Sequence, residues 1–394
     1  MKLLYLIDDM VNLGGMERIL SLKMNYLAER TEHRIFFVTN GQKDKPISFP
    51  LSERITYIPI DAVIADSEHY GFLSWIPAFI KSRTIFKNNL RNVLMQVRPD
   101  IIICTGYAFR CIDIIIRLAE EMQSKVIMES HVDGPEVLLS RQFSYNDNIR
   151  NLLSIFDSHI FHQLNRLSAI VTLTHADAQF WNSYNNNVLV IPNMITIKPK
   201  DVKDYSVKRI ISAGRFTYQK GYDLLIDAWN LVIPHYPDWQ LSIYGNGNPI
   251  IYSNQLIRYK LSGTIRFLPA TLDIVEKYAE SSIYVMSSRF EGFGLVLGEA
   301  MSCGLPCVSF DCPNGPNEII KNGEDGILVP NGDINALAEA MEKLMEDVEL
   351  RRNMGQNAKR NIQRFNEDAI MDKFLRISKQ IVAGERISLE HRDN

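Results

Sequence analysis

Short apolar runs alternate with longer amphipathic segments along almost the whole chain. The first run, Lys2–Ile7, is apolar after its first residue, as is typical of a parallel strand buried on both faces. The segment after it, Met16–Arg30, carries apolar residues at helical spacing. Six more runs in the first half predict strands: Arg34–Thr39, Ile55–Ile60, Ile101–Cys104, Lys125–Ser130, Ala169–Thr174 and Val188–Pro192. This alternation predicts a doubly wound α/β domain.

A polar stretch with weak periodicity, about Thr196–Val207, precedes a second series of the same kind. The second series predicts strands at Lys208–Ser212, Trp239–Tyr244, Thr264–Leu268, Ser282–Met286, Pro306–Phe310 and Gly326–Pro330. Helical patterns then fill Ile334–Phe365 and Glu367–Val382. We therefore predict two Rossmann-like domains, residues 1–197 and 205–366, whose doubly wound sheets face each other across a cleft.

Composition restricts the class of protein. The chain has 394 residues, 46% of them hydrophobic and 23% charged, and a net charge of −3, which is ordinary for a globular protein and gives no sign of nucleic-acid binding. The chain has no run of 18 apolar residues, so no membrane span is predicted. The N-terminus is typical of a strand rather than a signal peptide, and we therefore expect a cytoplasmic protein. The five cysteines show no disulfide framework and no zinc spacing, and are expected to be buried free thiols.

One stretch, residues 288–304, combines a strand end, a glycine turn and a helix start. Gly292 and Gly294 open the turn after the strand Ser282–Met286. The helix N-terminus after it offers free N–H groups and about half a positive charge, so an anion such as phosphate is expected there. Glu291 precedes this site, and Glu299 lies roughly 7–8 Å along the helix at 1.5 Å per residue. A nucleotide-sugar, with a phosphate between two hydroxyl-bearing groups, fits this pattern.

A second strand end supplies cations. The sequence Gly-Arg-Phe-Thr-Tyr-Gln-Lys-Gly places Arg215 and Lys220 in one strand-to-helix loop, where they could bind phosphate oxygens. Two solvated surface cations are the alternative. No Asp-x-Asp pair occurs, so a diphosphate would be neutralised by these cations and by helix N-termini, and no metal is expected.

Glycine loops, one histidine and a basic segment are further candidate features. The glycine loops at Gly14-Gly15 and after Tyr244 lack the spacing of a dinucleotide-binding fingerprint, which argues against an oxidoreductase. His131 follows a strand and is either a structural histidine or a group in the predicted cleft. Residues 71–99 carry five cations, no acid and several aromatic residues. This segment is either a helix packed on the first sheet or an edge that contacts an anionic membrane, at the inner face of the cell membrane.

Together, these motifs resemble the retaining nucleotide-sugar glycosyltransferases of glycosyltransferase family 4, the glycogen-synthase-like group with the GT-B fold. The family's Glu-x7-Glu signature is similar to Glu291–Glu299 within EGFGLVLGEAMSCGLP, its Arg and Lys pair to GRFTYQKG, and its N-terminal glycine loop to GGMER. Weaker similarities are SHVDG, IVTLT and IPNMI, and the resemblance covers residues 1–375. Gly298 departs from the family, which often has a larger apolar residue there.

The resemblance implies roles for the site residues. The C-terminal domain would hold the donor, the N-terminal domain most of the acceptor, and the last helix, 367–382, would cross back to the first domain. Arg215 and Lys220 would bind the diphosphate, Glu299 the ribose, and Glu291 the transferred sugar, with His131 near the reacting carbon. These four, Glu291, His131, Arg215 and Lys220, are the catalytic candidates. The donor-binding candidates are Gly14, Gly15, Arg215, Lys220, Gly292, Phe293, Gly294, Leu295 and Glu299.

The function implied by the resemblance is transfer of a hexose or N-acetylhexosamine, with retained configuration, to a glycan or lipid-linked glycan. The segment Asp311–Ile320 resembles a subgroup that builds surface polysaccharides and commonly uses UDP-sugars. No general base is evident, so the leaving phosphate is expected to accept the proton from the acceptor hydroxyl. Two alternatives are a catalytically silent GT-B partner protein and a nucleotide-sugar epimerase of the same shape.

Overall fold

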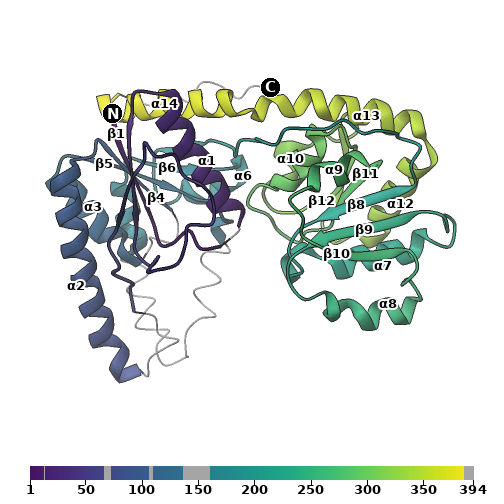
Figure 1. The fold of residues 1–394 in the computed structure, drawn as a ribbon, viewed down its shortest axis with the longest axis horizontal. Coiled ribbons are helices and arrows are strands. Elements are labelled where there is room, and N and C mark those ends of the chain that lie inside the picture. The colour runs from purple at the N-terminus through teal and green to yellow at the C-terminus, as the bar shows by residue number, and fades with distance from the viewer. Residues whose placement is uncertain (13, 66–71, 106–109, 136–159, 386–394) are drawn as a thin grey trace. The chain divides into compact units, whose positions relative to one another are not determined.

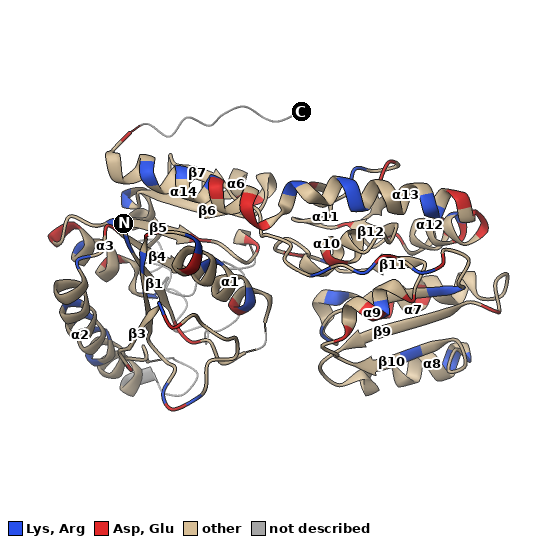
Figure 2. Cartoon of the chain, turned by 45° about the horizontal axis from the view of Figure 1, so that its top comes forward, with Lys and Arg blue, Asp and Glu red and all other residues tan. Residues whose placement is uncertain are grey.

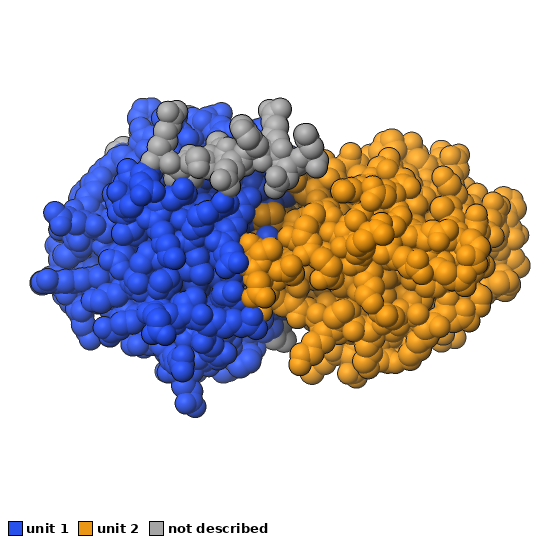
Figure 3. Space-filling model, turned by 90° about the horizontal axis from the view of Figure 1, so that it is seen from above, with its two compact units in different colours: residues 1–191, 370–394 blue, residues 192–369 orange. Residues whose placement is uncertain are grey.

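The protein is described from a computed structural model that covers residues 1–12, 14–65, 72–105, 110–135 and 160–385 (Figure 1). The chain forms two compact units, shown in different colours in Figure 3. The first unit comprises Met1–Ile191 and Ile370–Asn394, and the second comprises Pro192–Ala369. The first segment of this unit thus ends six residues before residue 197, and before the polar stretch Thr196–Val207 that was expected to link the domains.

The first unit is built on a seven-stranded, fully parallel sheet in the order β3-β2-β1-β4-β5-β6-β7. Its strands are β1 (Lys2–Ile7), β2 (Arg34–Thr39), β3 (Thr56–Pro59), β4 (Ile101–Thr105), β5 (Lys125–Glu129), β6 (Ala169–Thr172) and β7 (Val188–Val190). Its helices include α1 (Gly15–Arg30), α2 (Phe72–Val97), α3 (Ile112–Glu121) and α6 (His175–Trp181). Most of α14 (Glu367–Ala383) belongs to this unit as well.

Apolar side chains pack the helices onto the sheet. On one face, Leu90 and Leu94 of α2 and Ile115 of α3 join a cluster with Leu4 and Leu6 of β1, and all five are buried. The sequence selects this arrangement because β1 is apolar on both faces, whereas each helix has one apolar stripe.

Within the basic segment at residues 71–99, Phe72–Val97 form helix α2, which carries Lys and Arg but no Asp or Glu (Figure 2). Trp75 and Phe86 are buried. Arg83 forms an ion pair with Asp113 at 2.6 Å, and Arg91 pairs with Glu121 at 2.7 Å. The apolar stripe of α2 therefore packs inward; contact with a membrane stays a prediction.

The second unit contains a six-stranded parallel sheet in the order β10-β9-β8-β11-β12-β13. Its strands are β8 (Arg209–Ala213), β9 (Gln240–Gly245), β10 (Ile265–Pro269), β11 (Ile283–Met286), β12 (Cys307–Asp311) and β13 (Gly326–Pro330). Its α-helices are α7 (Tyr222–Val232), α8 (Ser253–Tyr259), α9 (Ile274–Ala279), α10 (Leu295–Ser302), α11 (Pro316–Ile319), α12 (Ile334–Glu346) and α13 (Val348–Asn361).

The predicted fold class, two doubly wound parallel sheets, is confirmed. The cleft expected between them stays a prediction. Helices fill Ile334–Phe365 as predicted, and Asp347 separates α12 from α13 within this range. The Asp347 carboxylate accepts a hydrogen bond from the Leu350 N–H at 2.8 Å and so begins a new helix. The five cysteines are buried free thiols, as predicted. Within the part of the chain that the structure describes, no helix is long and apolar enough to cross a membrane.

Candidate functional site

The second sheet places two loops side by side. Strand β8 lies between β9 and β11. The chain adds strands on one side of β8 up to β10 and on its other side from β11 onward, so the strand order reverses at β8. In open parallel sheets, ligands bind outside the carboxyl ends of the strands at such a switch point. The loop after β8 contains Arg215 and Lys220, and the loop after β11 contains Glu291 and Gly292. Strand order therefore brings together two motifs that lie far apart in sequence.

Gly221 allows these loops to approach closely. It has a φ of +60°, and a Cβ added to it would lie 2.1 Å from the backbone oxygen of Ser287. A side chain at this position would be strained by the left-handed backbone and would also collide with the neighbouring loop. The Ser287 hydroxyl donates a hydrogen bond to the Lys220 backbone oxygen at 3.0 Å, which holds the two loops together.

Lys220 and Glu291 form an ion pair at the meeting point of the loops. The Lys220 Nζ lies 2.6 Å from Glu291 Oε1, and the two side chains are 14% and 7% exposed. The Ser288 hydroxyl donates to the same carboxylate oxygen at 2.6 Å. The carboxylate is thereby fixed by a cation and a hydroxyl, while Lys220 keeps further N–H donors for a ligand.

Arg289 is a further residue of this site that the sequence analysis missed. Its guanidinium forms a forked ion pair with Asp223, at 2.9 and 2.5 Å, and lies 4.1 Å from the ring centre of Tyr218. Burial raises the pKa of the Asp223 carboxyl, but Arg289 lowers it by a larger amount, so the pKa falls below its usual value. The signal was available, because an arginine immediately before the Glu291 motif is well placed to contact the preceding loop.

Arg215 lies in the same loop as Lys220 but is exposed. Its guanidinium donates to Gln219 Oε1 at 3.5 Å, a weak contact that an anion could displace. The structure therefore places both predicted cations in one loop, with Lys220 fixed and Arg215 turned toward solvent.

Helix α10 begins beside Glu291. Gly294, with a φ of +92°, is its N-cap, and the Leu297 N–H donates to the Gly294 oxygen at 2.9 Å. The N–H groups that precede Leu297 at this helix start have no acceptor within the helix, so Gly292, Phe293, Gly294 and Leu295 lie where an anion is expected to bind.

Glu299 is the fifth residue of α10 and is 3% exposed. Burial raises the pKa of the neighbouring Tyr278 hydroxyl well above its usual value, and the Glu299 charge raises it further. A Cβ added to Gly298, the preceding residue, would lie 2.6 Å from the end of the Ile195 side chain, so a larger residue here would require Ile195 to move.

The first unit holds His131 in a buried charged cluster. Glu129, at the end of β5, pairs with Lys23 of α1, and its other oxygen lies 3.1 Å from His131 Nε2. Burial raises the pKa of Glu129, but Lys23 and His131 together lower it by a larger amount, to about 2. The Lys23 ammonium also lies 4.7 Å from the ring centre of Phe374, in α14. Sequence analysis missed Lys23 and Glu129, because an acid within an apolar strand gives no sign of its partner.

Gly14 and Gly15 begin helix α1. Gly14 is its N-cap, and the Arg18 N–H donates to the Gly14 oxygen at 3.2 Å. A Cβ added to Gly14 would lie 2.3 Å from the Glu17 carboxylate, so the acidic side chain of the first turn already folds over this end. The predicted contact of these glycines with a diphosphate stays a prediction.

No group of three or more His, Cys, Asp or Glu side chains within the described ranges is arranged to hold a metal ion.

The chain is similar to known proteins in sequence and in fold. Residues 193–361, which make up most of the second unit, match the family model of glycosyl transferases group 1. An uncharacterized glycosyltransferase of Haemophilus influenzae is 29% identical over 273 residues, 65% of this chain and 77% of that protein. The exopolysaccharide phosphotransferase SCO2592 of Streptomyces coelicolor is 32% identical over 223 residues, 55% of this chain and 24% of that protein. The amylovoran biosynthesis glycosyltransferase AmsD of Erwinia amylovora is 31% identical over 215 residues, 52% of this chain and 60% of that protein.

Similarity to solved structures extends over both units. A sucrose-phosphate synthase from Thermosynechococcus elongatus aligns with a TM-score of 0.77 and 19% identity, over 98% of this chain and 100% of the other. At that identity the likeness shows the fold, which is that of the GT-B glycosyltransferases.

Proposed function

We propose that the chain is a retaining glycosyltransferase that transfers a sugar from a nucleotide-sugar, a UDP-sugar, to a glycan or lipid-linked glycan in surface polysaccharide biosynthesis. The observation that carries this proposal is the fixed Lys220–Glu291 pair, 2.6 Å apart, beside the N-terminus of α10. The match of residues 193–361 to group 1 glycosyltransferases and the similarity to a glycosyltransferase of amylovoran biosynthesis support it.

The charges of this site suit cleavage of a sugar–phosphate bond. Negative charge grows on the diphosphate as the bond breaks, and Arg215, Lys220 and the N–H groups at the start of α10 would stabilise it. Each well-placed donor is expected to lower the barrier by about 2–4 kcal/mol, as in other anion holes. Because Lys220 and the N–H groups at the start of α10 are held in place before the ligand binds, these donors need little reorganisation during the reaction.

The two glutamates have different environments and different proposed roles. Glu291 is held by Lys220 and Ser288, which leaves its second oxygen for a hydroxyl of the transferred sugar. Glu299 would accept hydrogen bonds from the ribose hydroxyls. Neither is proposed as a general base, and the departing phosphate would take the proton from the acceptor hydroxyl.

A transfer assay with purified protein tests the proposal. UDP, GDP and ADP are first screened by thermal shift, because a ligand at 100 times its dissociation constant adds about 2.7 kcal/mol of stability. The sugar nucleotide of the base that binds is then supplied with a glycan acceptor, and the product anomer is read by NMR. We expect UDP to stabilise the protein and the anomeric configuration to be retained.

The outcomes separate the alternatives. Nucleotide binding without hydrolysis or transfer would favour a silent partner protein. Interconversion of the donor sugar in the absence of an acceptor would favour an epimerase. An inverted anomeric configuration would refute the retaining mechanism.

A further inference from the structure

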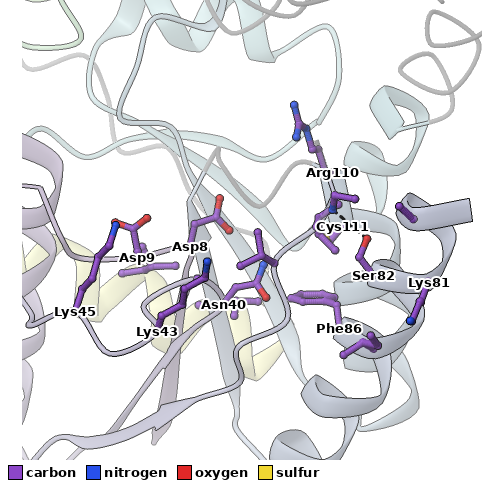
Figure 4. Close-up of a pocket in the computed structure, with 18 residues that line it drawn as sticks. Asp8, Asp9, Asn40, Lys43, Lys45, Lys81, Ser82, Phe86, Arg110 and Cys111 are labelled. Carbon is purple, nitrogen blue, oxygen red and sulfur yellow. Dashed lines mark hydrogen bonds between the residues drawn. The ribbon is translucent and has the colours of Figure 1, made fainter. Parts of the chain in front are cut away.

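The first unit contains a pocket of about 880 Å³ that the site described above does not use (Figure 4). Strand β1 lies between β2 and β4, so the pocket sits at the switch point of the first sheet. Its polar wall comes from four segments: Asp8 and Asp9 after β1, Asn40, Lys43 and Lys45 after β2, Lys81 and Ser82 of α2, and Arg110 before α3. The volume lies within the range for small-molecule sites and suits one or two sugar rings.

The pocket wall has an excess of positive charge. Four cationic side chains line it, Lys43, Lys45, Lys81 and Arg110, against the carboxylates of Asp8 and Asp9. Figure 4 shows Lys43 and Lys45 on the side of the two aspartates, and Lys81 on the side of α2. Among the residues that the structure describes, the ammonium groups of these three lysines form no ion pair. Free ammonium groups beside a concave surface attract an anion.

The centre of the pocket provides partners for hydroxyl groups. Asn40 is 5% exposed, and its Oδ1 has no hydrogen-bond partner among the described residues. A buried acceptor without a partner is costly, and a ligand hydroxyl would relieve that cost. Asp8 lies beside Asn40 in Figure 4 and offers a second acceptor. Val63 and Ile85, which are 52% and 42% exposed, supply an apolar wall for the carbon–hydrogen face of a sugar ring.

We propose that this pocket binds an anionic sugar acceptor, in which a phosphate or carboxylate group contacts Lys43, Lys45 and Lys81 while ring hydroxyls contact Asp8 and Asn40. The inference rests on the proposed glycosyltransferase function and names the class of its acceptor. A neutral glycan would leave the three lysines without partners, whereas an anionic acceptor uses the whole wall.

Binding to the full-length protein tests this assignment by titration calorimetry with two matched pairs of ligands. The first pair is N-acetylglucosamine 1-phosphate and N-acetylglucosamine, and the second is glucuronic acid and glucose. We expect the charged member of at least one pair to bind at least tenfold more tightly, and the pair that shows the difference identifies phosphate or carboxylate as the anion. Equal binding within both pairs, or no binding of any of the four, would overturn the inference.

Variants connect the charge preference to the pocket. The double variant Lys43→Ala/Lys45→Ala is expected to reduce the preference to less than threefold, and Lys81→Gln to weaken it in part. Lys87→Ala, on the same helix but outside the pocket lining, is the matched control and should keep the full preference. An unchanged preference in Lys43→Ala/Lys45→Ala and in Lys81→Gln would place the anion elsewhere.

The same preparations distinguish the two proposals. UDP-sugar turnover by a protein without charge preference would overturn the acceptor inference alone. Preferential binding of anionic sugars by a protein that neither binds UDP nor turns over a UDP-sugar would overturn the proposed function alone.

Discussion

The Lys220 ammonium lies 2.6 Å from a carboxylate oxygen of Glu291, although the two residues are 71 positions apart in the chain. Both side chains are mostly buried, at 14% and 7% exposure. Removing one partner of such a pair leaves the other charge without compensation, at a typical cost of about 3–5 kcal/mol for a fully buried pair and less here. Each charge is therefore needed to compensate the other at the junction of the two loops, and the pair also shapes the proposed donor site.

A double-mutant cycle on this pair measures that compensation. We expect Lys220→Ala and Glu291→Gln each to lower the free energy of unfolding by about 2–3 kcal/mol, and the double variant to lose about 1–3 kcal/mol less than the sum. Urea denaturation gives the values. The exposed pair of Lys208 and Asp238, 53% and 57% exposed, is the control and should couple by less than about 1 kcal/mol. Additive effects at Lys220 and Glu291 would show that the contact does not contribute.

The two glutamates are expected to differ in kinetics. Glu299→Ala should mainly weaken nucleotide binding, because it removes a carboxylate proposed to accept ribose hydroxyls, at about 1.5–3 kcal/mol or roughly 10- to 150-fold in affinity. Glu291→Ala should mainly lower kcat. Titration with UDP and steady-state kinetics separate the effects, and Glu339→Ala, at an exposed position of α12, is the control. Unchanged affinity and turnover in both variants would refute the proposed roles.

The sequence predicted the fold well because each half repeats one signal. Solid apolar runs such as Lys2–Ile7 form strands only when both faces are covered, which requires alternating helices and a parallel sheet. The ends of the helices were predicted less precisely than their presence. The interruption at Asp347 depends on one capping hydrogen bond, although an aspartate within a helical pattern is a recognisable start signal.

The site was predicted in parts but not as an arrangement. Lys220 and Glu291 were each assigned to an anion site, yet their direct contact depends on β8 lying beside β11, and strand order is not encoded in local periodicity. The same holds for Glu129 and Lys23, which are 106 residues apart. The pocket of the first unit went unnoticed because its lining comes from four separate segments.

Stability should depend on pH through Glu129. Its pKa is lowered from 4.5 to about 2, so its contribution is fully present above pH 4.5 and is lost as the pH falls toward 2. The difference corresponds to about 3 kcal/mol. We expect the free energy of unfolding to fall with acidification in the native protein and to change less steeply in Glu129→Gln.

Glu129→Gln should also be less stable at neutral pH by about 3–5 kcal/mol, because Lys23 would stay buried without a counter-ion. Glu121→Gln, which removes the partner of Arg91 at an exposed site, is the control and should cost less than about 1 kcal/mol. Identical pH profiles for the native protein and Glu129→Gln would contradict this account of the cluster.

Gly221→Ala should destabilise the second unit and displace Lys220, which immediately precedes it. Gly221 combines a φ of +60° with a Cβ position 2.1 Å from the Ser287 oxygen, so alanine meets both backbone strain and a collision with main chain. Left-handed backbone alone costs about 1–2 kcal/mol, and the collision adds to it.

Two other glycines separate these contributions in thermal unfolding. Gly332 has a φ of +79° and open space around it, so Gly332→Ala isolates the backbone cost. Gly263 has neither feature, and Gly263→Ala should be close to neutral. We expect the loss of stability to increase in the order Gly263→Ala, Gly332→Ala, Gly221→Ala, and we expect UDP binding to weaken only in Gly221→Ala. Equal losses in Gly332→Ala and Gly221→Ala would mean that the loops after β8 and β11 can separate freely, and the fixed position of Lys220 beside Glu291 would then not be a property of the backbone.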